Sequence, residues 1–472
     1  MPTQKIPLPQ KTRLDDEKTT IADNEGARIV DMYIDQQGNY RKRPCLKLLK
    51  DLGVTTKMDG LFWWDEKKIM IMVSGGRIYR MTSKTGEFED VTGTDLLVKG
   101  NKVSMVNDGS RVIMANGGKI MTYVFNATPE FITDAQAPTA VTHLGYLDQY
   151  ILALEKDKEL FWNSDVGDVT NWTSTSWQQT QSNPDIATSL LVSNGEINVV
   201  SRESYEFWWN DGITPFSRLD QKTLQNGCIA PHSHVDAAGS KLWVDNLRQI
   251  LQLDGINPVP VSGLIDNQLQ GTAPIADAQA FFIKFGAEPF YVVNFPTANK
   301  TFTYNLLSKQ WGEWGAWNTS KGDWDEFKCN VYAYSPVWDL HVMGDANTGK
   351  VFSFDANTFQ DDSNEVRSLI KTGHISYGTS RRKRSNKVRF VMKRGAGGES
   401  GNEPVFQFRW KDNGKDWSTW RTKSLGKLGE DQITVEFSRL GMYKTRQYEI
   451  VHSGNSDFIL VDAEEDVDLM RS

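Results

Sequence analysis

Two segments of this sequence carry side chains whose types and spacing could support chemistry. The segment RRKRSNKVRFVMKR, residues 381–394, holds eight basic residues and no acidic one, so it could contact phosphate or an acidic protein surface. The segment WGEWGAW, residues 311–317, places a tryptophan at every third position, and such indole rings could stack on sugar rings. Each segment also has a purely structural explanation.

We favour the structural explanations. Alternate residues of KVRFVMK, residues 387–393, would point outward from a solvated strand, and tryptophans often bury at interfaces between structural units or subunits. The basic segment is therefore interpreted as a solvated face or a protein contact rather than a nucleic-acid site. The tryptophans are interpreted as packing rather than sugar-binding residues. The candidate protein-contact residues are Arg381, Arg382, Lys383, Arg384, Trp311, Trp314 and Trp317.

The other polar residues form no recognisable catalytic or metal-binding motif. His232 and His234 could share one strand face, but no third metal ligand accompanies them. The stretch DANTGKVFSFD, residues 345–355, has turn residues but lacks the spacing and the terminal glutamate of an EF-hand. Motifs for nucleophilic serine, zinc proteases, P-loops and dinucleotide binding are absent from the sequence. The sequence thus predicts no enzyme activity, no cofactor and no metal site.

Composition limits the class of protein. The chain has 472 residues, of which 24% are charged and 39% hydrophobic, as in a soluble globular protein built from modules or repeats. A net charge of −7 does not supply the broad basic surface of a general duplex-DNA binder. Three widely separated cysteines argue against a disulfide scaffold, and no apolar run suits export or a membrane span. We expect synthesis in a cytoplasm.

Repeated hairpins are the elements that must position these residues. SGGRIYRM, residues 74–81, and NGGKIMTY, residues 116–123, each follow a hydrophobic run and share glycines that suit a tight turn. With five looser copies, the recurring second-strand positions are Tyr79, Tyr123, Phe161, Phe207, Leu251, Phe302 and Phe352. Their separations of 44, 38, 46, 44, 51 and 50 residues match the repeat of a propeller blade. The sequence predicts an all-β fold with a β-propeller of six or seven blades, and two stacked sandwiches are the alternative.

Changes in pattern suggest three parts. Residues 1–55 are polar with one short strand and indicate an extended N-terminal arm that packs on a neighbour or closes the ring. Residues 56–365 hold the propeller hairpins, and the longer alternating strands of residues 366–472 predict a C-terminal β-sandwich. GAGGESGNE, residues 395–403, is expected to be a flexible loop, and WKDNGKDWSTW, residues 410–420, resembles the structural Asp-box turn of sialidase-type propellers.

Several strings, taken in order, resemble one family. They are RKRPCLKLL near the N-terminus, SNPDIATSLL at residues 182–191, NGCIAPHS at residues 226–233, and FRWKDNGKDWSTW followed by FSRLGMYKTRQYEI and AEEDVDL. The series resembles the packaged-DNA-stabilisation proteins of short-tailed bacteriophages, also called tail hub or nozzle proteins. The resemblance covers most of the chain and is most specific from Phe408 to Asp468. Cys45 departs from the family pattern, which has glycine in an RPGL-like turn.

The resemblance implies a structural protein of the virion tail, synthesised in the host bacterial cytoplasm. It implies a homo-oligomeric ring, usually of six copies, below the portal and the head-to-tail adaptor. Such a ring would extend the DNA channel, retain the packaged genome without sequence-specific binding, and attach a tail needle or plug and tailspikes or fibres. The alternative function is a carbohydrate-binding or glycoside-cleaving propeller, which the tryptophans and the Asp-box-like turn would suit.

Overall fold

The structure is a computed structural model that describes residues 3–9, 27–183, 185–212, 216–393, 404–425 and 432–470. The expected loop at residues 395–403, Arg394 of the basic segment and residues 10–26 of the expected arm lie outside the described residues. Strands dominate the described chain, whose helical elements are the 3-10 turn η1 (Asp220–Lys222) and the short helix α1 (Asp266–Gly271).

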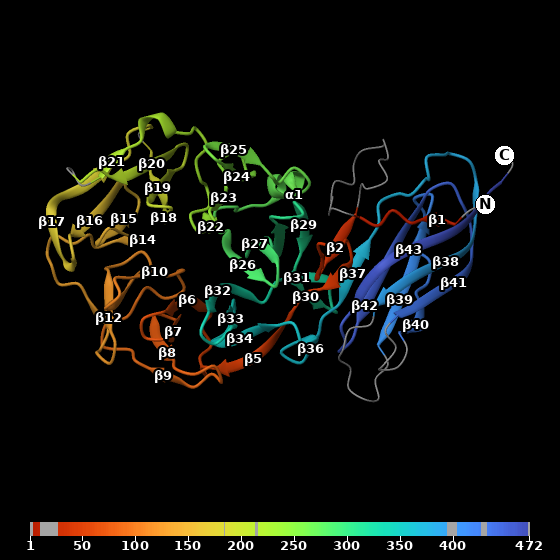
Figure 1. Cartoon of the computed structure of the whole chain (residues 1–472), viewed down its shortest axis with the longest axis horizontal. Helices are drawn as coiled ribbons and strands as arrows, with labels where there is room; N and C mark the ends of the chain where they lie inside the picture. The colour runs from red at the N-terminus through yellow and green to blue at the C-terminus, as the bar shows by residue number, and fades with distance from the viewer. Residues whose placement is uncertain are drawn as a thin grey trace.

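Seven sets of four antiparallel strands surround a common axis in the part of the chain that is described (Figure 1). They are β6 (Met58–Trp64), β7 (Ile69–Ser74), β8 (Arg77–Met81), β9 (Phe88–Asp90); β10 (Ser104–Asn107), β11 (Arg111–Ala115), β12 (Met121–Val124), β13 (Glu130–Phe131); β14 (Val141–Leu147), β15 (Tyr150–Glu155), β16 (Leu160–Asp165), β17 (Asp168–Gln179); β18 (Ala187–Ser193), β19 (Glu196–Ser201), β20 (Tyr205–Asn210), β21 (Phe216–Arg218); β22 (Val235–Ala237), β23 (Ser240–Val244), β24 (Ile250–Asp254), β25 (Asn257–Pro260); β26 (Gln279–Phe285), β27 (Glu288–Phe295), β28 (Lys300–Asn305), β29 (Gln310–Glu313); and β32 (Cys329–Ser335), β33 (Leu340–Asp345), β34 (Lys350–Asp355), β5 (Cys45–Asp51). The innermost strands form a closed circle, in which β32 contacts β6. The all-β propeller predicted from the sequence is confirmed, with seven blades.

The seven recurring sequence positions occupy equivalent places in this propeller. Each lies on the third strand of its blade, and each side chain is buried between neighbouring sheets. The glycine pair in the turn between β7 and β8 is required by geometry, because Gly75 and Gly76 adopt φ values of 59° and 83°. A side chain at Gly76 would also bring a Cβ within 2.3 Å of the Leu97 carbonyl oxygen. The repeat therefore encodes one hairpin per blade.

Strand β5 closes the ring from the N-terminal side of the chain. It runs antiparallel to β34, with Leu46 opposite Phe354 and Leu48 opposite Phe352, and Figure 1 shows it as the outermost strand of the last blade. The first and last blades are thereby joined through strands that are distant in sequence. A closed sheet circle leaves fewer exposed edges than an open array of the same strands.

The sandwich beside the propeller is built from both ends of the chain. One sheet contains β1 (Gln4–Lys5), β3 (Met32–Ile34), β4 (Tyr40–Lys42), β43 (Ile459–Leu469), β38 (Lys383–Lys393) and β41 (Gln432–Tyr443). The other contains β2 (Arg28–Val30), β37 (Ser368–Lys371), β42 (Arg446–Ser453), β39 (Val405–Asp412) and β40 (Arg421–Ser424). A single apolar core between the sheets takes side chains from both termini. The short N-terminal strands are thus part of the sandwich within this chain.

The two units share a sheet. Strand β2 pairs in parallel with β29, the outer strand of the sixth blade, through Val30 and Glu313. Two hairpins fill the junction, β30 (Gly315–Asn318) with β31 (Asp323–Glu326), and β35 (Gln360–Asp361) with β36 (Asn364–Glu365). Propeller and sandwich are therefore connected by backbone hydrogen bonds as well as by side chains.

A buried ionic cluster lies where the chain passes from the sandwich to β5. Arg43 is fully buried, and its Nε donates to Asp31 Oδ1 at 2.7 Å while its NH2 group donates to Asp361 Oδ2 at 2.6 Å. The two aspartates also accept the backbone N–H groups of Gly315 and Leu46. Burial raises the pKa of Asp31 to about 6, against the opposing effect of the Arg43 charge. One guanidinium thus joins the N-terminal strands, the junction hairpins and the closing strand.

The closing strand supplies a matched pair of leucines for testing its contribution to stability. Leu46 is fully buried between the sixth and seventh blades, whereas Leu48 on the same strand is 40% exposed. We expect Leu46→Ala to lower the free energy of unfolding by about 2–5 kcal/mol, because it leaves a cavity in a packed core. Leu48→Ala should have a much smaller effect. Urea unfolding monitored by tryptophan fluorescence measures both, and equal effects would contradict the structural role of β5.

Arg43 allows a second test. We expect Arg43→Met to destabilise the fold by about 3–5 kcal/mol, because it leaves two buried carboxylates without their cation. The control is Arg77→Met, which removes an exposed ion pair with Asp90 and should change the unfolding midpoint little. Thermal and urea unfolding of the two variants would refute the role of the cluster if both midpoints stayed at the wild-type value.

Candidate interaction surfaces

The basic segment lies in the sandwich, in and just before strand β38. Arg381, Arg382 and Arg384 are exposed, and Arg381 donates to the Met470 carbonyl oxygen at 3.1 Å. Lys383 is fully buried, and its Nζ donates to the carbonyl oxygens of Thr379 and Arg381 at 2.7 and 3.0 Å. The arginines therefore present charge to solvent, whereas the lysine fastens the start of the strand.

Farther along β38 the basic residues face acidic neighbours. Lys387 and Arg389 pair with Glu436 of β41 at 2.8 and 3.1 Å, and Arg389 also approaches Glu464 of β43. Such cross-strand pairs neutralise this part of the segment. The charge that remains available to a partner is concentrated at the arginine end.

The three tryptophans of residues 311–317 have different surroundings. Trp311, on β29, is buried in the core between the fifth and sixth blades. It donates its Nε1 hydrogen to the Val261 carbonyl oxygen at 2.7 Å. Trp314 is buried in the core between the sixth and seventh blades, near the Arg43 guanidinium. Trp317 on β30 is half-buried and retains exposed surface. Of the three, Trp317 is the residue whose ring this chain leaves partly open to contact.

Trp317 belongs to a continuous series of contacting arginine and tryptophan side chains, which we term the Arg–Trp ladder. Its members, in order of contact, are Arg28, Trp324, Trp317, Arg367, Trp420, Arg409 and Trp417. The Arg367 guanidinium lies 4.4 Å from the Trp317 ring centre and 5.7 Å from that of Trp420. Arg409 lies 4.3 Å from Trp420 and 4.8 Å from Trp417. Each such contact contributes on the order of 0.5–1 kcal/mol at partly exposed sites.

The ladder joins two segments that looked unrelated in the sequence. Trp317 comes from WGEWGAW at the propeller edge, and Trp420 and Trp417 come from WKDNGKDWSTW in the sandwich. The turn in the second segment is structural, since Asn413 adopts a φ of 53° and accepts the backbone N–H groups of Lys444 and Thr445. The ladder therefore fixes the sandwich against the propeller across their junction.

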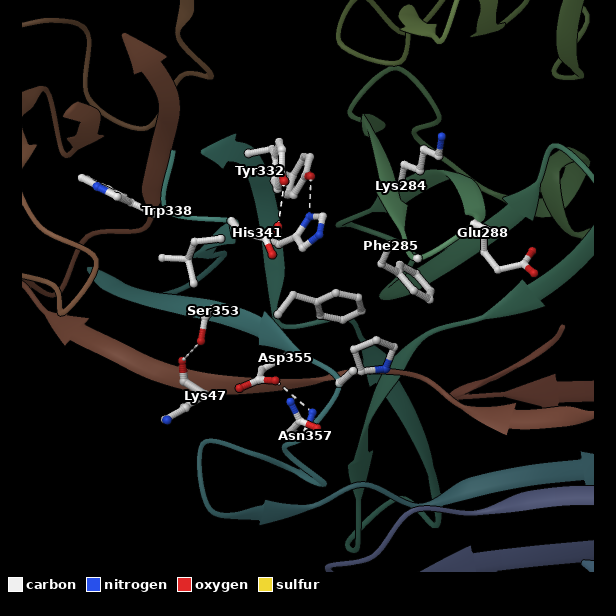
Figure 2. A pocket seen from close by; sticks show the side chains of 18 of the residues that line it. Lys47, Lys284, Phe285, Glu288, Tyr332, Trp338, His341, Ser353, Asp355 and Asn357 are labelled. Carbon is white, nitrogen blue, oxygen red and sulfur yellow. Dashed lines mark hydrogen bonds between the residues drawn. The ribbon is translucent and has the colours of Figure 1, made fainter. Parts of the chain in front are cut away.

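A broad groove of about 1490 Å³ opens where the sixth and seventh blades meet the β3–β4 hairpin (Figure 2). Aromatic side chains line it, including Tyr332, whose hydroxyl lies 2.8 Å from Nδ1 of His341. Its charged lining residues balance, with four basic and four acidic side chains: Arg41, Lys47, Lys84 and Lys284 against Asp35, Glu288, Asp339 and Asp355. Figure 2 shows Lys284 and Glu288 from the sixth blade opposite Lys47 and Asp355 from the seventh. Such a mixed surface suits a polypeptide better than a highly charged ligand.

A second cavity, of about 480 Å³, lies on the propeller axis among the innermost strands. Its lining includes Lys102, His143, His232 and His234 together with apolar side chains. Burial lowers the pKa of His143 to about 4 and that of His234 to about 3. These histidines are therefore neutral at pH 7.

The histidine pair noted in the sequence does not form a metal site here. Both ring nitrogens of His234 are hydrogen-bonded, Nδ1 to Ser189 Oγ and Nε2 to Tyr205 Oη, each at 3.1 Å. Among the residues that the structure describes, no three His, Cys, Asp or Glu side chains are placed to hold a metal ion. Within the same ranges, no helix is both long and apolar enough to cross a bilayer.

Sequence reasoning missed the Arg–Trp ladder, the groove and the axial cavity. Arg367 and Arg409 lie far from Trp317 in the chain, so spacing alone gave no reason to connect them. The repeated tryptophans flanked by arginine in residues 409–421 were the only available signal for the ladder. The groove is formed by strand ends of two blades and the N-terminal hairpin, and no local motif marks it.

Buried neutral histidine predicts acid sensitivity. His234 has a pKa of about 3 when folded, against about 6.5 in an unfolded chain, so the unfolded state binds its proton first as the pH falls. Its stabilising contribution is complete above pH 6.5 and decreases by roughly 3 kcal/mol on acidification to pH 4. We expect His234→Gln to flatten the pH dependence of unfolding over this range by that amount. Buried Asp31 and half-buried Glu326, whose pKa values are raised, act in the opposite direction, so the comparison with wild type is essential.

The half-buried His341 provides the control for this measurement. Burial also lowers the pKa of His341, but the ring is partly solvated at the groove. His341→Gln should therefore change the pH dependence less than His234→Gln. An unchanged profile in the His234 variant, measured by urea unfolding between pH 4 and pH 7, would contradict this assignment.

Comparison with solved structures finds chains of low similarity. The chain is similar to YCF48 bound to a D1 peptide, with 12% identity, a TM-score of 0.42 and coverage of 67% of this chain and 98% of that one. A mitotic checkpoint complex chain matches with 12% identity, a TM-score of 0.43 and coverage of 69% and 94%. The extracellular domain of a one-component system from B. thetaiotaomicron matches with 12% identity, a TM-score of 0.45 and coverage of 91% and 60%. We draw no functional conclusion from these likenesses.

Sequence comparison is more specific. No curated protein matches the chain. A family model described as bacteriophage P22 Gp10, β-propeller, matches residues 18–359, which is 342 of the 472 residues and includes the closing strand and all seven blades. The chain therefore belongs to the family of bacteriophage P22 Gp10, the packaged-DNA-stabilisation proteins of phage virions.

Proposed function

We propose that this protein is the tail hub, or nozzle, subunit of a short-tailed phage. In this proposal a ring of subunits, usually six, sits below the portal and adaptor and extends the channel through which the genome leaves. The ring retains packaged DNA and attaches the tail needle or plug and the tailspikes. The family match over residues 18–359 is the observation that carries the proposal.

The geometry of the subunit supports a mechanical role. The propeller is closed by β5, and the sandwich is fixed to it by a shared sheet, by the Arg43 cluster and by the Arg–Trp ladder. A wall element of a channel must transmit force between neighbours without changing shape. Interlocked sheets and a buried ionic cluster provide that stiffness more directly than a single flexible linker would.

The overall charge suits a channel through which DNA passes without being held. The net charge is −7, so the molecule as a whole repels the DNA backbone weakly. Ring formation requires heterologous contacts between two different surfaces of each subunit. We infer that the exposed arginines ahead of and within β38 and the open side of Trp317 serve protein contacts rather than DNA contacts.

Charge reversal at the arginine end of β38 tests this inference. We expect the combined substitutions Arg381→Glu, Arg382→Glu and Arg384→Glu to leave the fold intact, because all three side chains are exposed. Assembly with the adaptor or spikes should fall at least tenfold, since repulsion replaces complementary attraction. Native mass spectrometry and negative-stain imaging of the purified components would measure ring and adaptor complexes.

The matched control reverses charge elsewhere. Lys156→Glu and Lys158→Glu alter exposed lysines at the β15–β16 turn of the third blade and should assemble as wild type. If the arginine variant assembles normally but packages or ejects DNA abnormally, the segment faces the channel and the protein-contact proposal is wrong. If the wild-type protein forms no ring with or without the adaptor, the hub proposal itself fails.

A further inference from the structure

The axial cavity has an unusual balance of ionisable groups. Its lining includes Lys102 and three histidines, and none of the described residues that line it is an aspartate or a glutamate. The strands that enclose it come from the first six blades, so the groups converge from separate parts of the chain. Lys102 and His232 are half-buried and His143 is buried, and a basic group largely withdrawn from water is ordinarily paired with an acid, a metal or another ligand.

Lys102 shows the consequence most clearly. Its Nζ donates one hydrogen bond, to the Ala280 carbonyl oxygen at 2.9 Å. An ammonium group has three donors, so two remain for another acceptor. Burial and the nearby charge of Lys57 lower the pKa of Lys102 to about 8, and no carboxylate opposes this effect.

Two of the histidines adjoin this lysine. The rings of His143 and His232 stack with their centres 5.1 Å apart and their planes inclined by 30°. Nδ1 of His143 lies 3.1 Å from the Thr142 hydroxyl, and the His143 ring also hydrogen-bonds the Pro231 backbone, while no described residue hydrogen-bonds the ring of His232. Burial, reinforced by His143, Lys102 and Lys57, lowers the pKa of His232 well below its ordinary value. The ring of His234 is hydrogen-bonded as well, with Ser189 and Tyr205 on its two nitrogens, so His232 is the histidine whose ring is left to a ligand.

The geometry points to a binding site for a small oxyanion of the phosphate class, formed on the propeller axis by Lys102 and His232, with the His143 ring stacked on His232. The three side chains come from different blades and face one cavity without a carboxylate among the described lining residues. A bound oxyanion would supply the counter-charge that Lys102 lacks and accept the N–H donors of Lys102 and His232. The cavity volume of about 480 Å³ leaves room for the ion with accompanying water.

Two further lysines influence the groups of this cavity without lining it. Lys57 interacts with Asp59 and Glu326 as well as with Lys102, so part of its charge is already balanced. Lys241 influences His234 rather than the stacked pair. Binding should strengthen below pH 8, where Lys102 is charged, and strengthen further as the anion draws protons onto His143 and His232. This inference does not depend on the proposed tail function.

Thermal unfolding with inorganic phosphate tests the site. We expect 5–10 mM phosphate, at constant ionic strength, to raise the unfolding midpoint of the wild-type protein by about 2 °C or more at pH 6.5, and by less at pH 9. Lys102→Met should lose most of this rise, and His232→Gln should lose part of it. Lys158→Met, at an exposed lysine of the third blade, is the matched control and should respond as wild type. Sulfate, which stays a dianion throughout, should give the same pattern.

The comparison of variants separates site binding from general effects of these salts. Phosphate and sulfate stabilise many proteins through exclusion from the surface. An equal rise in the wild type and in Lys102→Met would therefore overturn the proposal, even if both rises were large. A Lys102-dependent rise with a short single-stranded oligonucleotide but not with free phosphate would also overturn it, because the site would then recognise a polynucleotide backbone. Far-UV circular dichroism checks that each variant remains folded.

Discussion

The buried contact between Arg43 and the carboxylates of Asp31 and Asp361 is the constraint on which the architecture depends. Asp31 lies between β2 and β3 of the sandwich, Arg43 lies just before the closing strand β5, and Asp361 lies in β35, after the last blade. A buried guanidinium keeps its proton and its charge. Burial of Arg43 therefore requires both carboxylates to stay beside it. Ring closure and attachment of the sandwich are therefore coupled, because the same cation participates in both.

The described residues join the two units at several places, which adds to this coupling. The β2–β29 pairing continues one sheet from the sixth blade into the sandwich, and the Arg–Trp ladder covers the same junction from the side. Interdomain contacts in many chains are small and polar, which permits relative motion. Here backbone pairing, a buried ion cluster and stacked rings act together. These contacts stiffen the junction between the propeller and the sandwich.

Features set by neighbouring residues could be predicted from the sequence, whereas features set by contacts between distant segments could not. The recurrence of a hydrophobic run, a short polar turn and a second run of aromatic or aliphatic residues located the third strand of all seven blades, as at Tyr79, Phe161 and Phe352. It could not show that strands of three residues, such as β2 and β4, complete a sandwich with partners more than three hundred positions later. The basic segment shows the same limit. Its sequence does not indicate that Lys383 is buried while Arg382 and Arg384 on either side are exposed. The ladder and the axial cavity depend on contacts between blades, which no single segment records.

The placement of both chain ends in the sandwich has a consequence for biosynthesis. Figure 1 shows the two termini close together beyond the propeller, and Gln4 pairs with Glu465 on the last strand. The closing strand leaves the ribosome early but must wait for a partner 306 positions downstream, as the Ser353 to Lys47 contact shows. Domains ordinarily fold in the order in which they are made, and distant strand pairing is slow. The propeller therefore cannot close until β34 has been made, and the sandwich cannot be completed until β43 has been made.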